Sequence, residues 1–191
     1  MAFGGMIFVL FGGFLLLVVA IGVLGILSAK KRREAFQALA AQRGWAYAER
    51  DDRWVDAFDG APFGLGHNRR ADNVIQGRWS DRTFVAFDYV YYTTETSTDA
   101  EGHTTHREVS HTYGVVAVDA GASFPALEVT PEGFFTRMMG RLTNRDIELE
   151  SEDFNRAFTV TCPDRKFASD VLHTRMMEFL LAHREAAFRF D

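Results

Sequence analysis

The feature that most constrains this chain is an N-terminal stretch without a single charge, which runs from Met1 to Ala29. Residues 3–28 are apolar throughout, and a helix needs roughly 20 such residues to cross the hydrocarbon core of a bilayer. A cleaved signal peptide is the alternative, but it has cations before a shorter apolar core. No cation precedes this stretch. We therefore expect residues 1–29 to form a transmembrane anchor.

Four consecutive cations follow the apolar stretch, namely Lys30, Lys31, Arg32 and Arg33. Positive charges beside a spanning helix tend to remain on the cytoplasmic side. The sequence therefore predicts a single-pass protein of the cell membrane, with its C-terminal part in the cytoplasm. The four cations themselves are expected to lie among anionic lipid headgroups.

The residues after the cations favour an uninterrupted helix. They are rich in strong helix formers and place Phe36, Leu39 and Ala40 on one face. Gly44 is a residue type that commonly follows the end of a helix. We expect residues 30–44 to form a juxtamembrane helix that joins the anchor to the folded part without a flexible linker.

Residues 45–191 are enough for one domain with a hydrophobic core and too few for two of ordinary size. β-branched and aromatic residues, or a clean apolar–polar alternation, predict strands at residues 45–48, 73–79, 83–94, 107–121, 127–129, 146–150, 157–162 and 188–190. Helices are expected nearer the C-terminus, with caps at Thr130, Asp164 and Thr174. Runs of strands followed by helices predict an α+β domain with a mostly antiparallel sheet and C-terminal helices.

The predicted strand at residues 83–94 is apolar on both faces, which is typical of a central strand covered on both sides. Asp88 interrupts it, and a buried carboxylate needs a partner. One interpretation is a structural ion pair, for which Arg78 on the neighbouring strand is a candidate. The other is a catalytic acid or base with a raised pKa.

Three histidines, His103, His106 and His111, lie close together in the sequence and are a residue type that binds transition metals. His106 and His111 are five positions apart, so on one strand they point to opposite faces. We expect no metal site there. An enzyme active site would instead bring Asp88, His67 or His111 together in one pocket.

The other candidate groups have structural interpretations. Asp146, Glu148 and Glu150 alternate along a strand and indicate a solvated face rather than a cation site. Cys162, the single cysteine, precedes Pro163 without a patterned base and is expected to be a buried apolar residue. We therefore predict no catalytic, cofactor-binding or metal-binding residues and no cofactor, and enzymatic activity is the less favoured interpretation.

Charge restricts the class of partner. The chain carries a net charge of −5, so without the four juxtamembrane cations the remainder carries −9. Nucleic acid requires a basic surface and is excluded as an expected partner. The membrane, a protein partner or a second copy remain, and a small-residue face in the anchor permits a homodimer contact through Gly22, Gly25 and Ala29.

Four segments carry a resemblance to a known family: FVAFDYVYY (84–92), LEVTPEG (127–133), FNRAFTV (154–160) and DVLHTRMMEFLLAHR (170–184). Together they resemble an uncharacterised family of bacterial, mainly actinobacterial, membrane-anchored proteins. The resemblance implies one N-terminal transmembrane helix followed by a domain of unknown function. It implies no activity and no catalytic residue.

These observations favour a membrane-tethered cytoplasmic domain that binds or scaffolds a partner. The alternative is an enzyme, or a sensor of a ligand or metal, that acts at the membrane surface.

Overall fold

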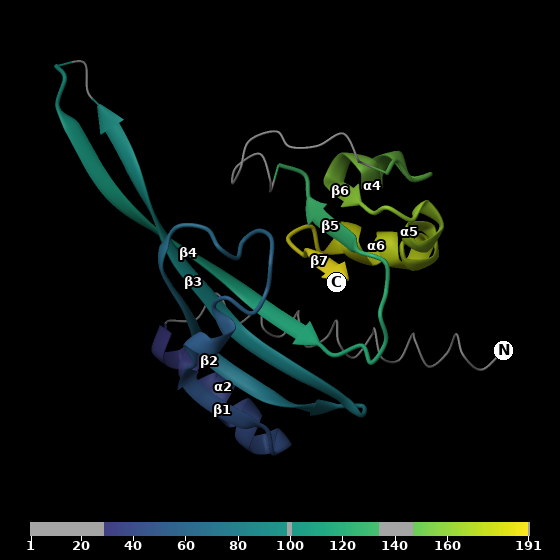
Figure 1. The fold of residues 1–191 in the computed structure, drawn as a ribbon, viewed down its shortest axis with the longest axis horizontal. Helices are drawn as coiled ribbons and strands as arrows, with labels where there is room; N and C mark the ends of the chain where they lie inside the picture. Colours follow the sequence, from purple (N-terminus) through teal and green to yellow (C-terminus); the bar gives the residue numbers. More distant parts are fainter. Residues whose placement is uncertain (1–28, 99–100, 134–146, 191) are drawn as a thin grey trace. The chain divides into compact units, whose positions relative to one another are not determined.

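A computed structural model of the chain describes residues 29–98, 101–133 and 147–190 (Figure 1). Apart from Ala29, the predicted membrane anchor lies outside these residues. None of the helices within them is both long and apolar enough to cross a membrane. The described residues form two compact units that divide between Ala120 and Gly121. The sequence had grouped residues 45–191 as one domain, so this division is a feature that the structure adds.

The first unit contains a helix, a single 3-10 turn and a four-stranded sheet: α2 (Ala29–Arg43), β1 (Ala46–Arg50), η1 (Asp52–Trp54), β2 (His67–Trp79), β3 (Arg82–Thr98) and β4 (Thr104–Val118). The strand order is β1-β2-β3-β4, and every neighbouring pair is antiparallel. The α+β class and the hairpin of β2 and β3 are therefore confirmed. As predicted, β3 is central, and all its residues from Phe84 to Tyr91 are buried.

Helix α2 covers one face of this sheet. Its Phe36 and Ala40 pack against Ile75, Phe84 and Ala86, which come from β2 and β3. The helix ends at Arg43, and Gly44 follows in the left-handed region at φ 67°, the conformation that commonly closes a helix. The predicted end of the juxtamembrane helix is confirmed.

The opposite face of the sheet is covered by the segment between β1 and β2. Rings of Trp54, Phe58 and Phe63 in this segment lie against the rings of β3. The segment returns to the sheet at Gly66, where φ is +61° and a side chain would collide with the Tyr92 carbonyl oxygen. Only glycine combines that backbone conformation with so close an approach.

Strands β3 and β4 continue together beyond the end of β2, as Figure 1 shows. The outermost partners of β2 and β3 are His67 and Tyr92. Beyond them, residues 93–98 of β3 pair with residues 104–109 of β4 without a break in register. The sheet thus extends into a two-stranded ribbon, whose side chains are almost all polar and exposed.

The second unit combines short strands and helices: β5 (Leu127–Pro131), α4 (Glu152–Ala157), β6 (Phe158–Thr161), α5 (Arg165–Val171), α6 (Thr174–Ala182) and β7 (Phe188–Phe190). Its strands form an antiparallel sheet in the order β6-β5-β7. The sequence anticipated β5, β6 and β7, and it anticipated helices between the last two.

Two local predictions in this unit are wrong. Thr130 does not cap a helix, because it pairs with Thr159 and belongs to β5. The expected strand at residues 146–150 is absent from its described part, residues 147–150, where Ile147 makes one backbone hydrogen bond to Val160 at 2.9 Å. At Thr130, pairing with β6 overrides the local sequence pattern. At Leu149, the Asn155 side chain bonds to the backbone N–H at 3.0 Å and to the backbone C=O at 2.8 Å, in place of a strand partner.

The predicted helix caps differ in outcome. The Asp164 carboxylate accepts a hydrogen bond from the Phe167 backbone N–H at 3.0 Å and caps α5, as expected. The N-cap of α6 is His173, and Thr174 is its first helical residue. Helix α4, which Ser151 caps, was not predicted.

Candidate functional site

The candidate site is a polar network between α2 and the sheet, centred on Asp88. Asp88 lies in the middle of β3, between Asp72 on β2 and Gly114 on β4. Its exposed fraction is 3%. A carboxylate that deep in a hydrophobic layer is tolerated only when charged and hydrogen-bonding partners surround it.

Arg32 of α2 supplies the opposite charge. Its guanidinium contacts both carboxylate oxygens of Asp88: Nε donates to Oδ2 at 2.7 Å, and Nη2 donates to Oδ1. This two-pronged geometry is the strongest arrangement of an arginine and a carboxylate. The prediction that Arg78 pairs with Asp88 is wrong. Arg78 lies opposite Thr83 near the hairpin turn, and its side chain donates to the Asp81 carbonyl oxygen.

Two neutral side chains complete the network. Asn73 donates from Nδ2 to Asp88 Oδ2 at 2.8 Å, and the Tyr47 hydroxyl donates to Asn73 Oδ1 at 3.0 Å. Asn73 lies at an irregularity in the β2–β3 register and has φ 53°, a conformation that asparagine tolerates better than most residues. Burial is the main cause that raises the pKa of the Tyr47 hydroxyl.

The cationic run at the start of α2 therefore serves more than one purpose. The Arg32 side chain is 12% exposed and faces the sheet, whereas Arg33 forms a half-exposed ion pair with Glu49 at 2.8 Å. Lys30 is exposed and lies 3.9 Å from Glu34. The expectation that all four cations lie among lipid headgroups is thus wrong for Arg32, which is used inside the fold.

The opposite face of β3 carries aromatic rings instead of charges. Phe87 and Tyr89 are fully buried, and the Tyr91 ring stacks on His111 with a centroid distance of 4.7 Å. Burial, together with a hydrogen bond to Tyr113, raises the pKa of the Tyr91 hydroxyl far above its usual range. The Tyr92 ring, next along the strand, lies under the Arg70 guanidinium.

The candidate histidines do not converge with Asp88. His111 is opposite Tyr91 in the register and therefore lies on the aromatic face, whereas Asp88 lies on the face covered by α2. His67 bonds to Glu108 at 3.0 Å, and His106 bonds to Thr96 on the ribbon at 3.0 Å. Within the described residues, no group of three or more His, Cys, Asp or Glu side chains could hold a metal ion.

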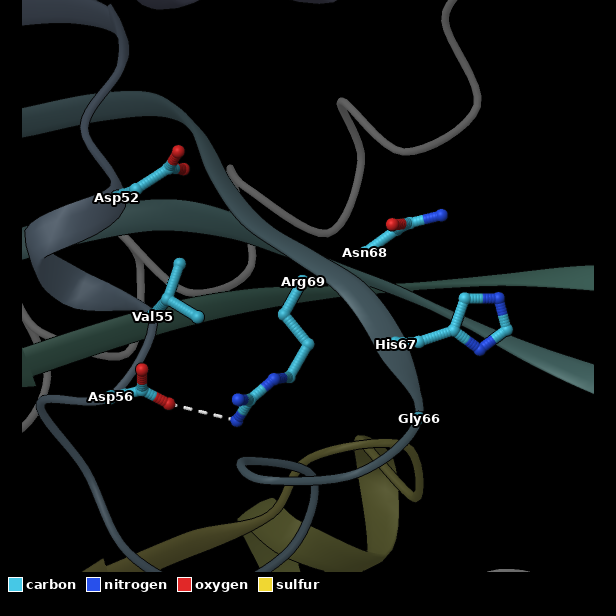
Figure 2. A pocket seen from close by; sticks show the side chains of 7 residues that line it. All are labelled: Asp52, Val55, Asp56, Gly66, His67, Asn68 and Arg69. Atoms are coloured by element: carbon cyan, nitrogen blue, oxygen red, sulfur yellow. Dashed lines mark hydrogen bonds and ion pairs between the residues drawn. The ribbon is translucent and has the colours of Figure 1, made fainter.

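A shallow surface hollow lies where the segment between β1 and β2 meets the start of β2. Figure 2 shows the residues that line it: Asp52, Val55, Asp56, Gly66, His67, Asn68 and Arg69. Its charged groups are already paired. Arg69 donates to Asp56 at 2.8 Å, and Arg50 donates to Asp52, whose pKa it lowers. The His67 ring points away from the Asp56–Arg69 pair (Figure 2).

The remaining candidates from the sequence are the single cysteine and the acidic residues at 146, 148 and 150. Cys162 is buried, and its Sγ donates to the Asp164 carbonyl oxygen at 3.1 Å. Glu148 and Glu150 are exposed, and Asp146 lies outside the described residues.

Sequence reasoning identified Asp88 but missed Arg32, Asn73 and Tyr47. One signal for Arg32 was present: it precedes Phe36 by one helical turn and Ala40 by two, so it shares the face of α2 that those residues bury. Its position in a run of cations favoured a lipid-facing interpretation instead.

A scan of the chain against models of known protein families finds no match, and a search of curated proteins finds none either. Among solved structures, the chain is similar to the crystal structure of the mycobacterial trehalose monomycolate transport factor A, TtfA. The sequence identity is 10%, the alignment covers 78% of this chain and 67% of that chain, and the TM-score is 0.40. A TM-score at that level supports no inference about the function of this chain.

Proposed function

We propose that this protein is a single-pass, membrane-tethered binding module whose folded part lies at the cytoplasmic face of the cell membrane. The charge-free segment and the cations after it support the tether and its orientation. The resemblance to membrane-anchored bacterial proteins agrees with both.

One observation carries the proposal, namely the ion pair between Arg32 and Asp88. Arg32 lies only a few residues after the apolar segment, and its side chain is held inside the first unit. Because α2 is packed on the sheet through this pair and through Phe36, the chain that leaves the bilayer enters the folded unit directly. Such a connection presents the unit in a defined orientation, which suits a module that docks a partner.

The enzyme alternative receives less support. Both oxygens of Asp88 already accept hydrogen bonds from Arg32 or Asn73, and His111 lies on the opposite face of the sheet. A catalytic acid or base must reach a substrate atom within hydrogen-bond distance. Asp88 is arranged as a structural anion.

Cysteine labelling tests the tether and its side. In a Cys162→Ala background, single cysteines replace Gln42 on α2 and Ser169 on α5, both of which are exposed. The full chain should sediment with membranes. A membrane-impermeant maleimide should label both positions only after the cells are permeabilised. Labelling in intact cells would contradict the cytoplasmic location, and recovery in the soluble fraction would contradict the tether.

Native mass spectrometry tests the binding role. The full chain, released from its own membranes in mild detergent, should appear in a complex of fixed stoichiometry. If it appears as a monomer at every concentration and in every detergent tried, the binding role is contradicted, whatever the labelling shows.

A further inference from the structure

The two edges of the four-stranded sheet differ in how well they are protected. In the part of the chain that the structure describes, β1 and β4 are the outer strands, and no strand pairs with the outer edge of β4. β1 has five residues and ends in two charged residues, Glu49 and Arg50, whereas β4 has 15 residues. A long edge strand exposes a row of backbone N–H and C=O groups that can pair with another chain.

Strand β4 lacks most of the devices that normally keep an edge from pairing. It contains neither proline nor lysine. Its register with β3 runs without a bulge from Thr104 to Val118, while the β2–β3 register shifts twice. Arg107 and Glu108 are its only side chains with a permanent charge, and both lie in the ribbon. The edge is therefore long, regular and weakly charged.

We propose that β4 pairs with β4 of a second copy of this chain, antiparallel and about a two-fold axis perpendicular to the sheet. Full overlap of two strands that run from Thr104 to Val118 places His111 on the axis. This register keeps the two faces of the sheet matched, because each residue then lies opposite one of the same parity. The two sheets become one continuous sheet.

The cross-strand neighbours in this register are compatible. Val109 lies opposite the partner's Tyr113, and Ser110 lies opposite the partner's Thr112. Aromatic–β-branched pairs and hydroxyl pairs both stabilise antiparallel strands. Arg107 lies opposite the partner's Val115 and Glu108 opposite the partner's Gly114, so no two permanently charged side chains of like sign face each other. The β4 strand of a second copy thus has the length and the side-chain pattern that pairing with β4 requires.

An axis perpendicular to the sheet leaves the α2 helices of both copies on the same face of the continuous sheet. The inference names a partner surface for the proposed binding function. The pairing of β4 does not itself require the tether, which the labelling experiment tests separately.

Disulfide cross-linking of the full chain in detergent tests the register. In a Cys162→Ala background, Ser110→Cys and Thr112→Cys chains are prepared separately and then mixed. Opposed antiparallel residues have Cα atoms about 4.5–5.5 Å apart, within the range of a disulfide. Mixed chains should form a Ser110→Cys to Thr112→Cys dimer, and each chain alone should form little. Equal cross-linking of either chain alone, or none in the mixture, would overturn the register.

Introduction of positive charge at the outer edge of β4 tests the interface itself. In Ser110→Lys/Thr112→Lys, two like-charge pairs face each other across the axis, and the dimer dissociation constant should rise roughly tenfold. Gln37→Lys/Gln42→Lys on α2 adds the same charge at exposed positions and should leave dimerisation unchanged. If the wild type is monomeric, or if the β4 variant dimerises as tightly as the control, the proposal fails. A complex with a different protein would leave the binding role intact and remove this inference alone.

Discussion

The two faces of the four-stranded sheet are covered by segments that different kinds of interaction hold in place. On one face, α2 is fixed by a buried ion pair, Arg32 with Asp88, together with a small apolar cluster around Phe36. On the other face, the segment before β2 is held by aromatic rings, of which Phe58 stacks on Phe87 and Phe63 lies tilted against Tyr89. Apolar packing is tolerant of small shifts, whereas a buried charge pair permits one position. The face that leads towards the predicted membrane anchor is the one with the specific contact.

The largest expected effect is loss of the ion pair. Asp88→Ala leaves Arg32 buried without its counter-charge and should lower the free energy of unfolding by about 3–5 kcal/mol. Denaturant unfolding of the full chain in detergent measures it, with fluorescence from Trp45 and Trp79, which pack beside the α2 cluster.

The neighbouring arginine provides a matched control. Arg33→Met breaks the half-exposed pair with Glu49 and should cost less than about 1 kcal/mol. The double variant Arg32→Met/Asp88→Leu, which removes both buried charges, should recover most of the loss. If Asp88→Ala and Arg33→Met have equal effects, the buried pair does not hold α2.

The aromatic face should respond less to a comparable truncation. Phe58 is half-buried and stacks on Phe87 with a centroid distance of 6.1 Å. Phe58→Ala should cost about 2 kcal/mol, because part of the ring already contacts solvent. Fluorescence of Trp54, which packs against both rings, reports on this face. A loss larger than that of Asp88→Ala would reverse the comparison.

A smaller change of opposite sign is expected at Tyr89. Its hydroxyl is buried and has no hydrogen-bond partner within the described residues. A polar group without a partner costs free energy when it is removed from water, so Tyr89→Phe should be neutral or stabilise by up to about 1 kcal/mol. Thermal unfolding measures the change. A clear loss of stability would show that the hydroxyl has a partner after all.

The smallest effect concerns pH. The pKa of Asp51 is lowered, chiefly by a hydrogen bond from Arg53. A carboxyl whose pKa is lower in the folded state stabilises the fold above its unfolded value, near 4, and loses this contribution as the pH falls through the folded value. Asp51→Asn keeps the cap of η1 and should lose less than about 1 kcal/mol at pH 7.

The difference between this variant and the wild type should disappear in acid, because the wild-type carboxyl is then also neutral. Denaturant unfolding at several pH values measures it. A difference that is independent of pH would mean that the charge of Asp51 contributes nothing.

Much of the fold follows from local patterns. The alternation along residues 83–94 predicted a central strand, and Gly44 and Asp164 predicted a helix end and a helix start. The pattern failed where a strand partner decided the outcome, as at Thr130, which looked like a cap and became part of β5. Local preference is a fraction of a kcal/mol per residue, and sheet pairing overrides it.

The sequence alone predicted that Asp88 would be buried and would need a partner, because both faces of its strand are apolar. Only the tertiary structure could select Arg32, which lies 56 positions away in the chain, over Arg78 on the adjacent strand. Spacing along a strand or helix reports which face a residue occupies. Which charge reaches across to that face depends on how separate elements pack, and no local pattern contains that information.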